Sequence, residues 1–332
     1  MASHSAKSTG PIGRWQIVST IVAVAAFLLA YYRVLGESRD YGQYESFFQL
    51  VRSLGLTVFD LTRFEAGFVV MAAVLTKFVP SDITVYSLFV AFAMWLKAAA
   101  VYRVPTRAGI FFATILFYFV RYFPLYELTQ LRAAMAAAFL IWALLLSSNG
   151  QRLYGLLACA IAVSFHFSAI AVVPFIFGAP TRRWLVVLIG VVVFGIAVLG
   201  TKALVSALGD AIRVASMYAT LGFGDLPPNP LSVGLLLDWA MIFVGLAIWP
   251  SLSPLMRQVL LIQIVGMAMF YGALDFAVVA HRLRELASVM WLLFVADGLH
   301  QRRIVRQCSV AFIVACICLY GYLFVFSGQF FV

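Results

Sequence analysis

Residues 184–199 read WLVVLIGVVVFGIAVL and residues 310–326 read VAFIVACICLYGYLFVF, and neither stretch contains Asp, Glu, Lys or Arg. A helix of about 20 apolar residues crosses roughly 30 Å of hydrocarbon. Transmembrane strands would instead need segments of about ten residues that alternate in polarity, which neither stretch does. Since a helix satisfies its own backbone hydrogen bonds in lipid, these runs predict membrane-spanning helices.

The rest of the chain has the same apolar character. Of 332 residues, 64% are hydrophobic and only 11% are Asp, Glu, Lys or Arg, whereas about 25% of the residues of a soluble domain are charged. This composition excludes a soluble enzyme, a disordered protein and a disulfide framework. At about 30 residues per span, the chain has room for roughly ten or eleven crossings. We therefore predict an all-α, polytopic integral membrane protein, with room for re-entrant or broken helices.

The formal net charge is +10, but the basic residues are scattered through short connections, as the positive-inside bias predicts. Without a clustered basic face, nucleic acid is excluded as a partner. The four cysteines lie in apolar runs or at their edges, without the spacing of a metal site or a disulfide, which is typical of small core residues. We expect neither a metal nor a cofactor.

Polar stretches divide the chain into segments. Residues 1–14 predict a cytoplasmic tail, followed by an uncleaved first span over 15–35, and 15–332 form one integral unit. Residues 36–64 and 205–230 are the two sizeable connections, and both are predicted to be periplasmic. The further candidate spans run over 65–79, 83–101, 109–123, 131–148, 153–178, 184–204, 231–249, 255–273, 281–298 and 308–326.

Strict alternation of these spans conflicts with the charge bias at two connections. From a cytoplasmic N-terminus, alternation places the basic residues of 181–183 and 302–306 inside, as the bias requires. It also places 102–107, with two arginines, outside and 130–132 inside. The run 65–79 is short, and the run 153–178 contains a histidine and a proline. We therefore expect one of these two runs to be re-entrant or broken.

Ionisable side chains within apolar runs are informative, because each costs at least a few kcal/mol at membrane depth. Arg132 opens an alanine-rich helix, His166 lies deep in the run 153–178, and Arg282 and Arg284 begin the span 281–298. A core role for His166 and a helix-end role for Arg284 stay open. Arginine grips phosphate oxygens and histidine exchanges a proton near neutral pH. Together they predict a site for a polyprenyl-pyrophosphate-linked sugar.

Five stretches carry a family resemblance. They are RDYGQYESFF (39–48), FEAGF (64–68), QLRAAMA (130–136), SFHFSAIAVVPF (164–175) and AHRLRELAS (280–288). In order and spacing the chain resembles the EpsG/Wzy-like family of bacterial polysaccharide polymerases.

The resemblance implies a glycosyltransferase of the bacterial cytoplasmic (inner) membrane with its active site facing the periplasm. Such an enzyme polymerises undecaprenyl-pyrophosphate-linked oligosaccharide repeat units into a surface polysaccharide or exopolysaccharide. The partners it implies, besides that substrate and membrane lipid, are a flippase and a chain-length regulator.

Roles for individual residues follow as hypotheses. Arg132 would hold pyrophosphate, while His166 or a carboxylate would act on the acceptor hydroxyl. The candidate catalytic residues are His166, Arg132, Asp40 and Glu65. The candidate residues for substrate and pyrophosphate binding are Arg282, Arg121, Arg284, Gln130, Tyr41 and Tyr44.

Two alternative functions stay open. An O-antigen-ligase-like or other lipid-linked glycosyltransferase would use the same chemistry with a different acceptor. A non-enzymatic transporter or flippase of anionic glycolipid would also use intramembrane Arg and His, although no internal repeat of fixed period favours it.

Overall fold

The computed structural model describes residues 13–35, 40–62, 64–104, 107–178, 181–208, 229–274 and 276–326. Within these ranges the regular structure is entirely helical. The first half contains α1 (Gly13–Tyr31), α2 (Tyr41–Leu54), η1 (Gly55–Asp60), α3 (Ala66–Phe78), α4 (Asp82–Arg103), α5 (Ala108–Arg121), α6 (Phe123–Tyr126), α7 (Leu131–Ser148) and α8 (Arg152–Phe165). The second half contains η2 (Phe167–Ala171), η3 (Val173–Phe175), α9 (Arg183–Leu208), α11 (Val233–Ala247), η4 (Trp249–Ser251), α12 (Pro254–Gly272), α13 (Ala277–Ser288), α14 (Trp291–Gly298) and α15 (Arg303–Phe326).

Six of the described helices are long and apolar enough to cross a membrane, namely α1, α4, α7, α9, α12 and α15. Four shorter apolar helices, α3, α5, α8 and α11, accompany them. The prediction of an all-α, polytopic membrane protein is confirmed. Residues 1–12 of the predicted tail 1–14 and most of the connection 205–230 lie outside the described residues, and α1 begins within the predicted tail, at Gly13.

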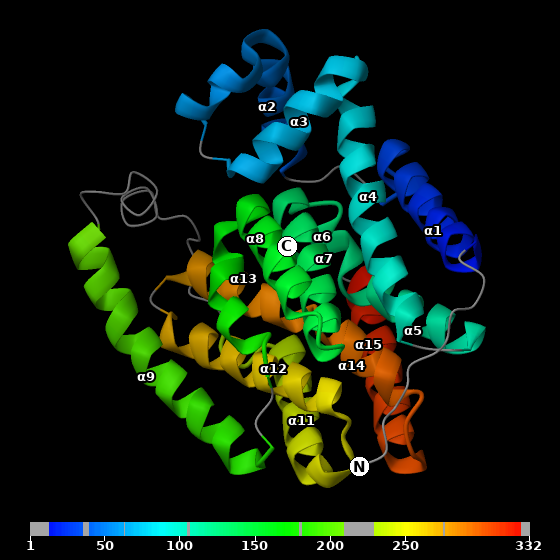
Figure 1. The fold of residues 1–332 in the computed structure, drawn as a ribbon, viewed down its shortest axis with the longest axis vertical. Coiled ribbons are helices and arrows are strands. Elements are labelled where there is room, and N and C mark those ends of the chain that lie inside the picture. The colour runs from blue at the N-terminus through cyan, green and yellow to red at the C-terminus, as the bar shows by residue number, and fades with distance from the viewer. Residues whose placement is uncertain are drawn as a thin grey trace.

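Helix α7 lies at the centre of the bundle, packed against α4 on one side and α8 on the other (Figure 1). Its alanines at 133, 134, 136, 137 and 138 are all buried. Small side chains let helix backbones approach closely, which is how helices associate where lipid is as apolar as leucine. The alanine-rich run therefore fixes the position of Arg132, the second residue of this helix.

The expected span 153–178 is broken. Helix α8 ends at Phe165, His166 has an extended backbone (φ −155°, ψ 112°), and the chain continues as the two short helices η2 and η3. The break leaves backbone and side-chain polar groups at His166 free to pair outside the helix, so it confirms the expectation of an interrupted span. The expected span 281–298 is likewise divided, into α13 and α14.

The expected span 65–79 behaves differently. Helix α3 lies beside α2 at the top of Figure 1, at the same end of the bundle as the start of α4. Arg52 of α2 donates hydrogen bonds to Asp82 (2.8 Å) and to the carbonyl oxygens of Thr76 (2.9 Å) and Val79 (2.7 Å), which ties the end of α3 to both neighbours. Because the chain enters and leaves α3 at one end of the bundle, the strict alternation of spans is shifted by one from α4 onward.

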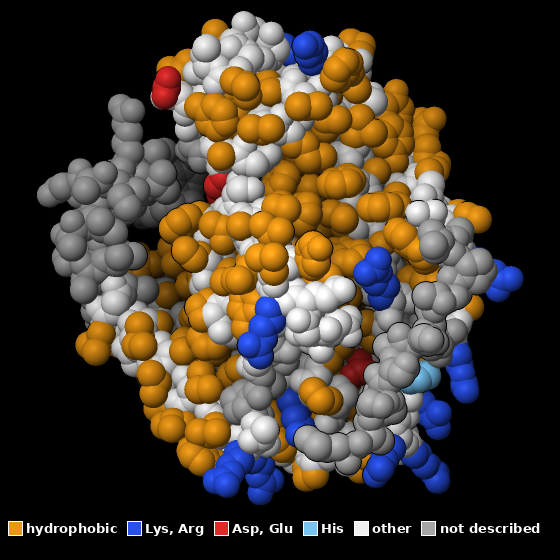
Figure 2. Space-filling view, in the orientation of Figure 1, with side chains coloured by type: hydrophobic (Ala, Val, Ile, Leu, Met, Phe, Trp, Pro, Cys, Tyr) orange, Lys and Arg blue, Asp and Glu red, His pale blue; other side chains and the backbone are white. Residues whose placement is uncertain are grey.

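This shift moves 102–107 inside and 130–132 outside. The broken run 153–178 shifts the order back, because Phe177 and Thr181 line the same cavity as Ser148 and Arg152, so 181–183 and 302–306 stay inside and the conflict between the charges and the order of the spans is removed. Two adjoining cavities bring Arg103, Arg152 and Arg257 to the end of the bundle where α7 finishes. Arg132 lies at the other end, sixteen residues before Ser148, or about 24 Å along the helix at 1.5 Å per residue. Figure 2 shows basic side chains gathered below a broad apolar belt. We call the end that contains Arg103 the basic end.

Candidate active site

Glu65, Arg132 and His166 meet at the end of the bundle opposite the basic end. Glu65 Oε2 accepts a hydrogen bond from Arg132 Nη1 at 2.5 Å, and Glu65 Oε1 lies 3.1 Å from His166 Nδ1. The backbone N–H of Phe167 also donates to Glu65 Oε1, at 3.3 Å. Three segments far apart in sequence are joined by one carboxylate, which we call the Glu65 cluster.

The cluster is only partly closed to its surroundings. The side chains of Arg132, Glu65 and His166 are 21%, 18% and 11% exposed. Two nitrogen atoms within it, His166 Nε2 and Arg132 Nε, are buried without a partner. These atoms are free to bind a further group.

Protonation in the cluster follows from its contacts. Burial raises the pKa of Glu65, but the hydrogen bond from His166 and the charge of Arg132 outweigh it and lower the pKa to about 2. Burial lowers the pKa of His166 from its usual 6.5. At neutral pH an ionised Glu65 therefore faces a neutral imidazole. Since a carboxylate accepts the Nδ1 proton, the lone pair is on Nε2, the arrangement of a general base oriented by an acid.

Local packing explains why Glu65 reaches this position. Glu65 directly precedes α3, and two residues later Gly67 packs against α8. A Cβ atom at Gly67 would lie 2.4 Å from Ser164 Oγ and 2.9 Å from the backbone oxygen of Ser164. No other residue type has room there, so the glycine brings the start of α3 against the end of α8. Phe64, the residue before Glu65, packs against the cluster, with the Arg132 guanidinium 4.7 Å from its ring centre.

Arg282 is a cation near this cluster without a carboxylate partner. Its helix α13 packs against η2 and α7, and its charge acts on both His166 and Tyr44. In the part of the chain that the structure describes, no carboxylate forms an ion pair with Arg282. Among the described groups near the Glu65 cluster, Arg282 is therefore a positive charge that stays available to an anionic substrate.

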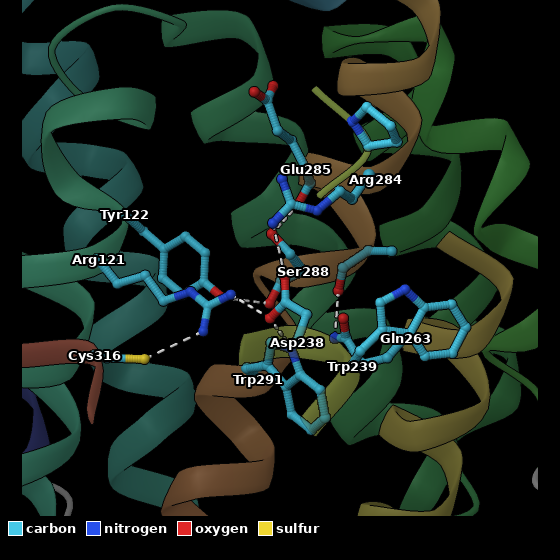
Figure 3. A network of polar contacts seen from close by, with 12 residues as sticks. Arg121, Tyr122, Asp238, Trp239, Gln263, Arg284, Glu285, Ser288, Trp291 and Cys316 are labelled. Carbon is cyan, nitrogen blue, oxygen red and sulfur yellow. Dashed lines mark hydrogen bonds and ion pairs between the residues drawn. The ribbon is translucent and has the colours of Figure 1, made fainter. Parts of the chain in front are cut away.

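Two other predicted arginines belong to a separate cluster. Arg121 and Arg284 reach Asp238 from different helices, as Figure 3 shows. Arg284 Nη2 lies 2.7 Å from Asp238 Oδ2, and Arg121 Nη2 is bonded to Oδ1. Trp291 Nε1 donates to the same Oδ1 at 2.9 Å. We call this the Asp238 cluster.

The Asp238 cluster is more deeply buried than the Glu65 cluster. The side chains of Arg121 and Asp238 are 1% and 2% exposed. Arg121 also lies between aromatic rings, 5.1 Å from the centre of Tyr122 and 5.2 Å from that of Phe312. The structure thus ties together helices α5, α11, α13 and α14, and it does not bring Arg121 or Arg284 to the Glu65 cluster.

The remaining predicted residues lie around the Glu65 cluster rather than within it. Tyr44 is buried, its ring stacked on Phe64 with centres 6.1 Å apart, and the charges of Arg132 and Asp40 act on its hydroxyl. Asp40 precedes α2. Tyr41 packs edge-on against Tyr86, with the Arg33 guanidinium 4.3 Å from its ring centre. Gln130 precedes α7 and is buried, its Oε1 without a partner.

A third polar cluster has no predicted role. Lys97 and Glu127 form a fully buried ion pair, and Tyr118 donates to both carboxylate oxygens of Glu127 (2.9 and 2.8 Å). In the sequence, Lys97 and Glu127 stand out only as charged residues within apolar runs. No sequence pattern predicts the ion pair between them. Among the described residues, no group of three or more His, Cys, Asp or Glu side chains is arranged to hold a metal ion.

Comparison with known proteins identifies the family of the chain. A model of the EpsG family matches residues 16–332. The chain therefore belongs to the EpsG family, which implies, broadly, a membrane polysaccharide polymerase of glycosyltransferase type. No curated protein and no solved structure matches the chain.

Proposed function

We propose that this protein polymerises oligosaccharide repeat units linked to undecaprenyl pyrophosphate, and that the Glu65 cluster with Arg282 is its active site. The observation that carries the proposal is the imidazole of His166, held through Nδ1 by Glu65 and with Nε2 unpaired, beside a cation that no described carboxylate neutralises. A base and a diphosphate-binding group are the two things that glycosyl transfer from a lipid diphosphate requires.

The orientation is part of the proposal. Cytoplasmic ends of membrane proteins are enriched in Lys and Arg, so we assign the basic end to the cytoplasm of a bacterial inner membrane. The Glu65 cluster then faces the periplasm. Repeat units that a flippase has delivered would reach it from the outer leaflet, and a chain-length regulator would act on the same side.

The residues then have defined tasks in the reaction. The acceptor hydroxyl gives its proton to His166 Nε2 as its oxygen forms a bond to the anomeric carbon of the donor. The bond from that carbon to the phosphate oxygen breaks, and its electron pair leaves with the lipid diphosphate. Arg282 and the unpaired Nε of Arg132 stabilise the charge that develops on the diphosphate. Glu65 stabilises the imidazolium.

Arg121 and Arg284 receive a different role from the one their sequence context predicts. Both are already bonded to Asp238, so we propose that they hold α13 in place and keep Arg282 close to His166. Asp40, Gln130, Tyr41 and Tyr44 would shape the rim of the site.

The test is glycan lengthening by the purified chain in liposomes, with lipid-linked repeat units extracted from cells that lack the protein. We expect long glycan from the wild type and only single units from Arg282→Ala. Arg302→Ala is the matched control, because this exposed arginine lies just before α15 at the basic end, and it should polymerise normally. Unchanged chain length in Arg282→Ala would contradict the proposed site. Transport of repeat units without lengthening would contradict the polymerase and favour a flippase.

A further inference from the structure

A cavity of about 290 Å³ lies at the basic end, far from the Glu65 cluster. The end of α7, the start of α8 and the start of α12 surround it. Its polar lining consists of Arg152, Arg257, Ser147, Ser148, Thr181 and Gln258. No Asp or Glu is among its lining residues, so the cavity has positive walls and hydroxyl groups.

The two arginines are free to bind an anion. In the described part of the chain neither forms an ion pair. Arg257 donates one long hydrogen bond, from Nη2 to the oxygen of Pro250 at 3.4 Å, and its Nε is buried without a partner. The guanidinium also lies 5.5 Å from the ring centre of Trp249. A buried N–H of a charged group costs free energy when it is unpaired, so this N–H is a donor that an anion bound at Arg257 can satisfy.

The start of α8 adds further donors at the same wall. Helix α8 begins at Arg152, and the side chain of Gln151 before it forms no capping hydrogen bond. The first N–H groups of a helix have no partner within the helix and favour a negative charge. Two guanidinium groups, hydroxyl groups and a helix start are the donors that phosphate oxygens accept from.

The adjoining cavity provides an internal comparison. It has a volume of about 320 Å³ and shares Ser148 and Pro254 with the first. Its lining combines one cation, Arg103, with the carboxylate of Asp297, and Arg103 lies 4.4 Å from the ring centre of Trp142. Charge is balanced there, whereas the Arg152–Arg257 cavity is positive.

We propose that the Arg152–Arg257 cavity binds a phosphate group, carried either by an anionic lipid headgroup or by a free phosphate. Binding there would link the ends of α7 and α8, the two helices whose opposite ends position Arg132 and His166. The site is independent of the polymerase proposal, since it uses none of the residues assigned to the reaction.

Thermal unfolding of the full-length protein in neutral detergent tests this proposal, since a ligand that binds only the folded state raises Tm with its concentration. One arm adds inorganic phosphate against chloride at equal ionic strength. The other adds phosphatidylglycerol against phosphatidylcholine in mixed micelles. A rise in Tm with phosphate identifies a free phosphate as sufficient, and a rise only with phosphatidylglycerol identifies a lipid headgroup.

Variants assign the response to this cavity. Arg152→Gln changes an exposed residue and is expected to weaken apparent affinity about tenfold or more, since a charged hydrogen-bonding partner is lost. Arg257→Lys, which keeps the charge but loses the fork, should weaken it as well. Arg103→Gln in the adjoining cavity should respond as the wild type does. The proposal fails if neither ligand raises Tm of the wild type, or if Arg152→Gln and Arg257→Lys respond as strongly as Arg103→Gln.

Discussion

The Glu65 and Asp238 clusters each join arginine to a carboxylate, and they differ in the other groups that the carboxylate binds and in their exposure. In the Asp238 cluster one carboxylate is shared by two arginines and an indole, and the Arg121 and Asp238 side chains are almost inaccessible. In the Glu65 cluster the side chains are partly exposed and His166 Nε2 has no partner. The difference teaches that a buried charge is by itself no sign of catalysis. An unpaired atom is no sign by itself either, since the Nε atoms of Arg121 and Arg284 also lack partners. The sign is an unpaired imidazole nitrogen, His166 Nε2, in a cluster whose side chains are all partly exposed.

The largest difference between the clusters should be in stability. Asp238→Asn removes the charge that two buried arginines share, and breaking a buried ion pair costs about 3–5 kcal/mol. We expect a strong loss of folded protein, measured as Tm in detergent and as yield in the membrane fraction. Glu65→Gln, at a more exposed pair, should cost much less. Equal losses of Tm in the two variants would contradict the distinction.

Catalysis should show the opposite pattern. His166→Ala removes the proposed base, and loss of a general base slows a reaction about 10²–10⁴-fold. We expect no glycan beyond the single repeat unit in the liposome assay, with Tm close to that of the wild type. His300→Ala changes an exposed histidine at the far end of α14 and serves as the control. Normal chain length in His166→Ala would exclude the imidazole from the reaction.

The close approach of α3 to α8 should affect the polymerisation rate only by positioning Glu65. Gly67→Ala places a Cβ 2.4 Å from Ser164 Oγ and 2.9 Å from its backbone oxygen, so α3 must shift away from α8, and Glu65 away from His166. A displacement of about 1 Å in a catalytic arrangement costs about 100-fold in rate, and we expect a 10- to 100-fold loss of polymerisation. Gly42→Ala, with open space around its Cβ, is the matched control. A fully active Gly67→Ala would show that the contact is not needed.

The smallest effect should be on pH dependence. The active imidazole is neutral, so the polymerisation rate should fall on acidification, with an apparent pKa below 6.5 because burial disfavours the imidazolium. Glu65 raises the pKa of His166, so Glu65→Gln should move this acid limb to still lower pH. Initial polymerisation rates measured across the acidic pH range would show this shift. A limb that moves to higher pH in the variant would contradict the assigned pairing.

Much of the fold follows from the sequence, because long apolar runs have few structures open to them in lipid. The break at His166 could be expected from a polar residue and a proline within one apolar run. The position of α3 could not, since hydropathy measures whether a run is apolar and not at which end of the bundle the chain leaves it. The position of α3 depends on the packing of Gly67 against α8 and on the hydrogen bonds of Arg52, and both are tertiary contacts.

The sequence singles out Glu65, Arg132 and His166 as candidates from separate motifs, and the structure joins them. The sequence could not separate Arg132 from Arg121 and Arg284. An arginine in an apolar run has the same sequence context whether its partner is a carboxylate or a substrate. The pairing with Asp238 depends on how α5, α11 and α13 face each other, which local sequence does not determine. Arg152 and Arg257 look like ordinary cytoplasmic charges until the cavity between them is seen.

The most direct test of the central claim is to map where the substrate binds. A photoreactive analogue of the lipid-diphosphate-linked repeat unit would be crosslinked to the protein in membranes, and the labelled peptides identified by mass spectrometry. The account predicts labelling of α13 around Arg282 and of the segment that follows His166. Labelling confined to the helices around Asp238, or to the basic end, would contradict it.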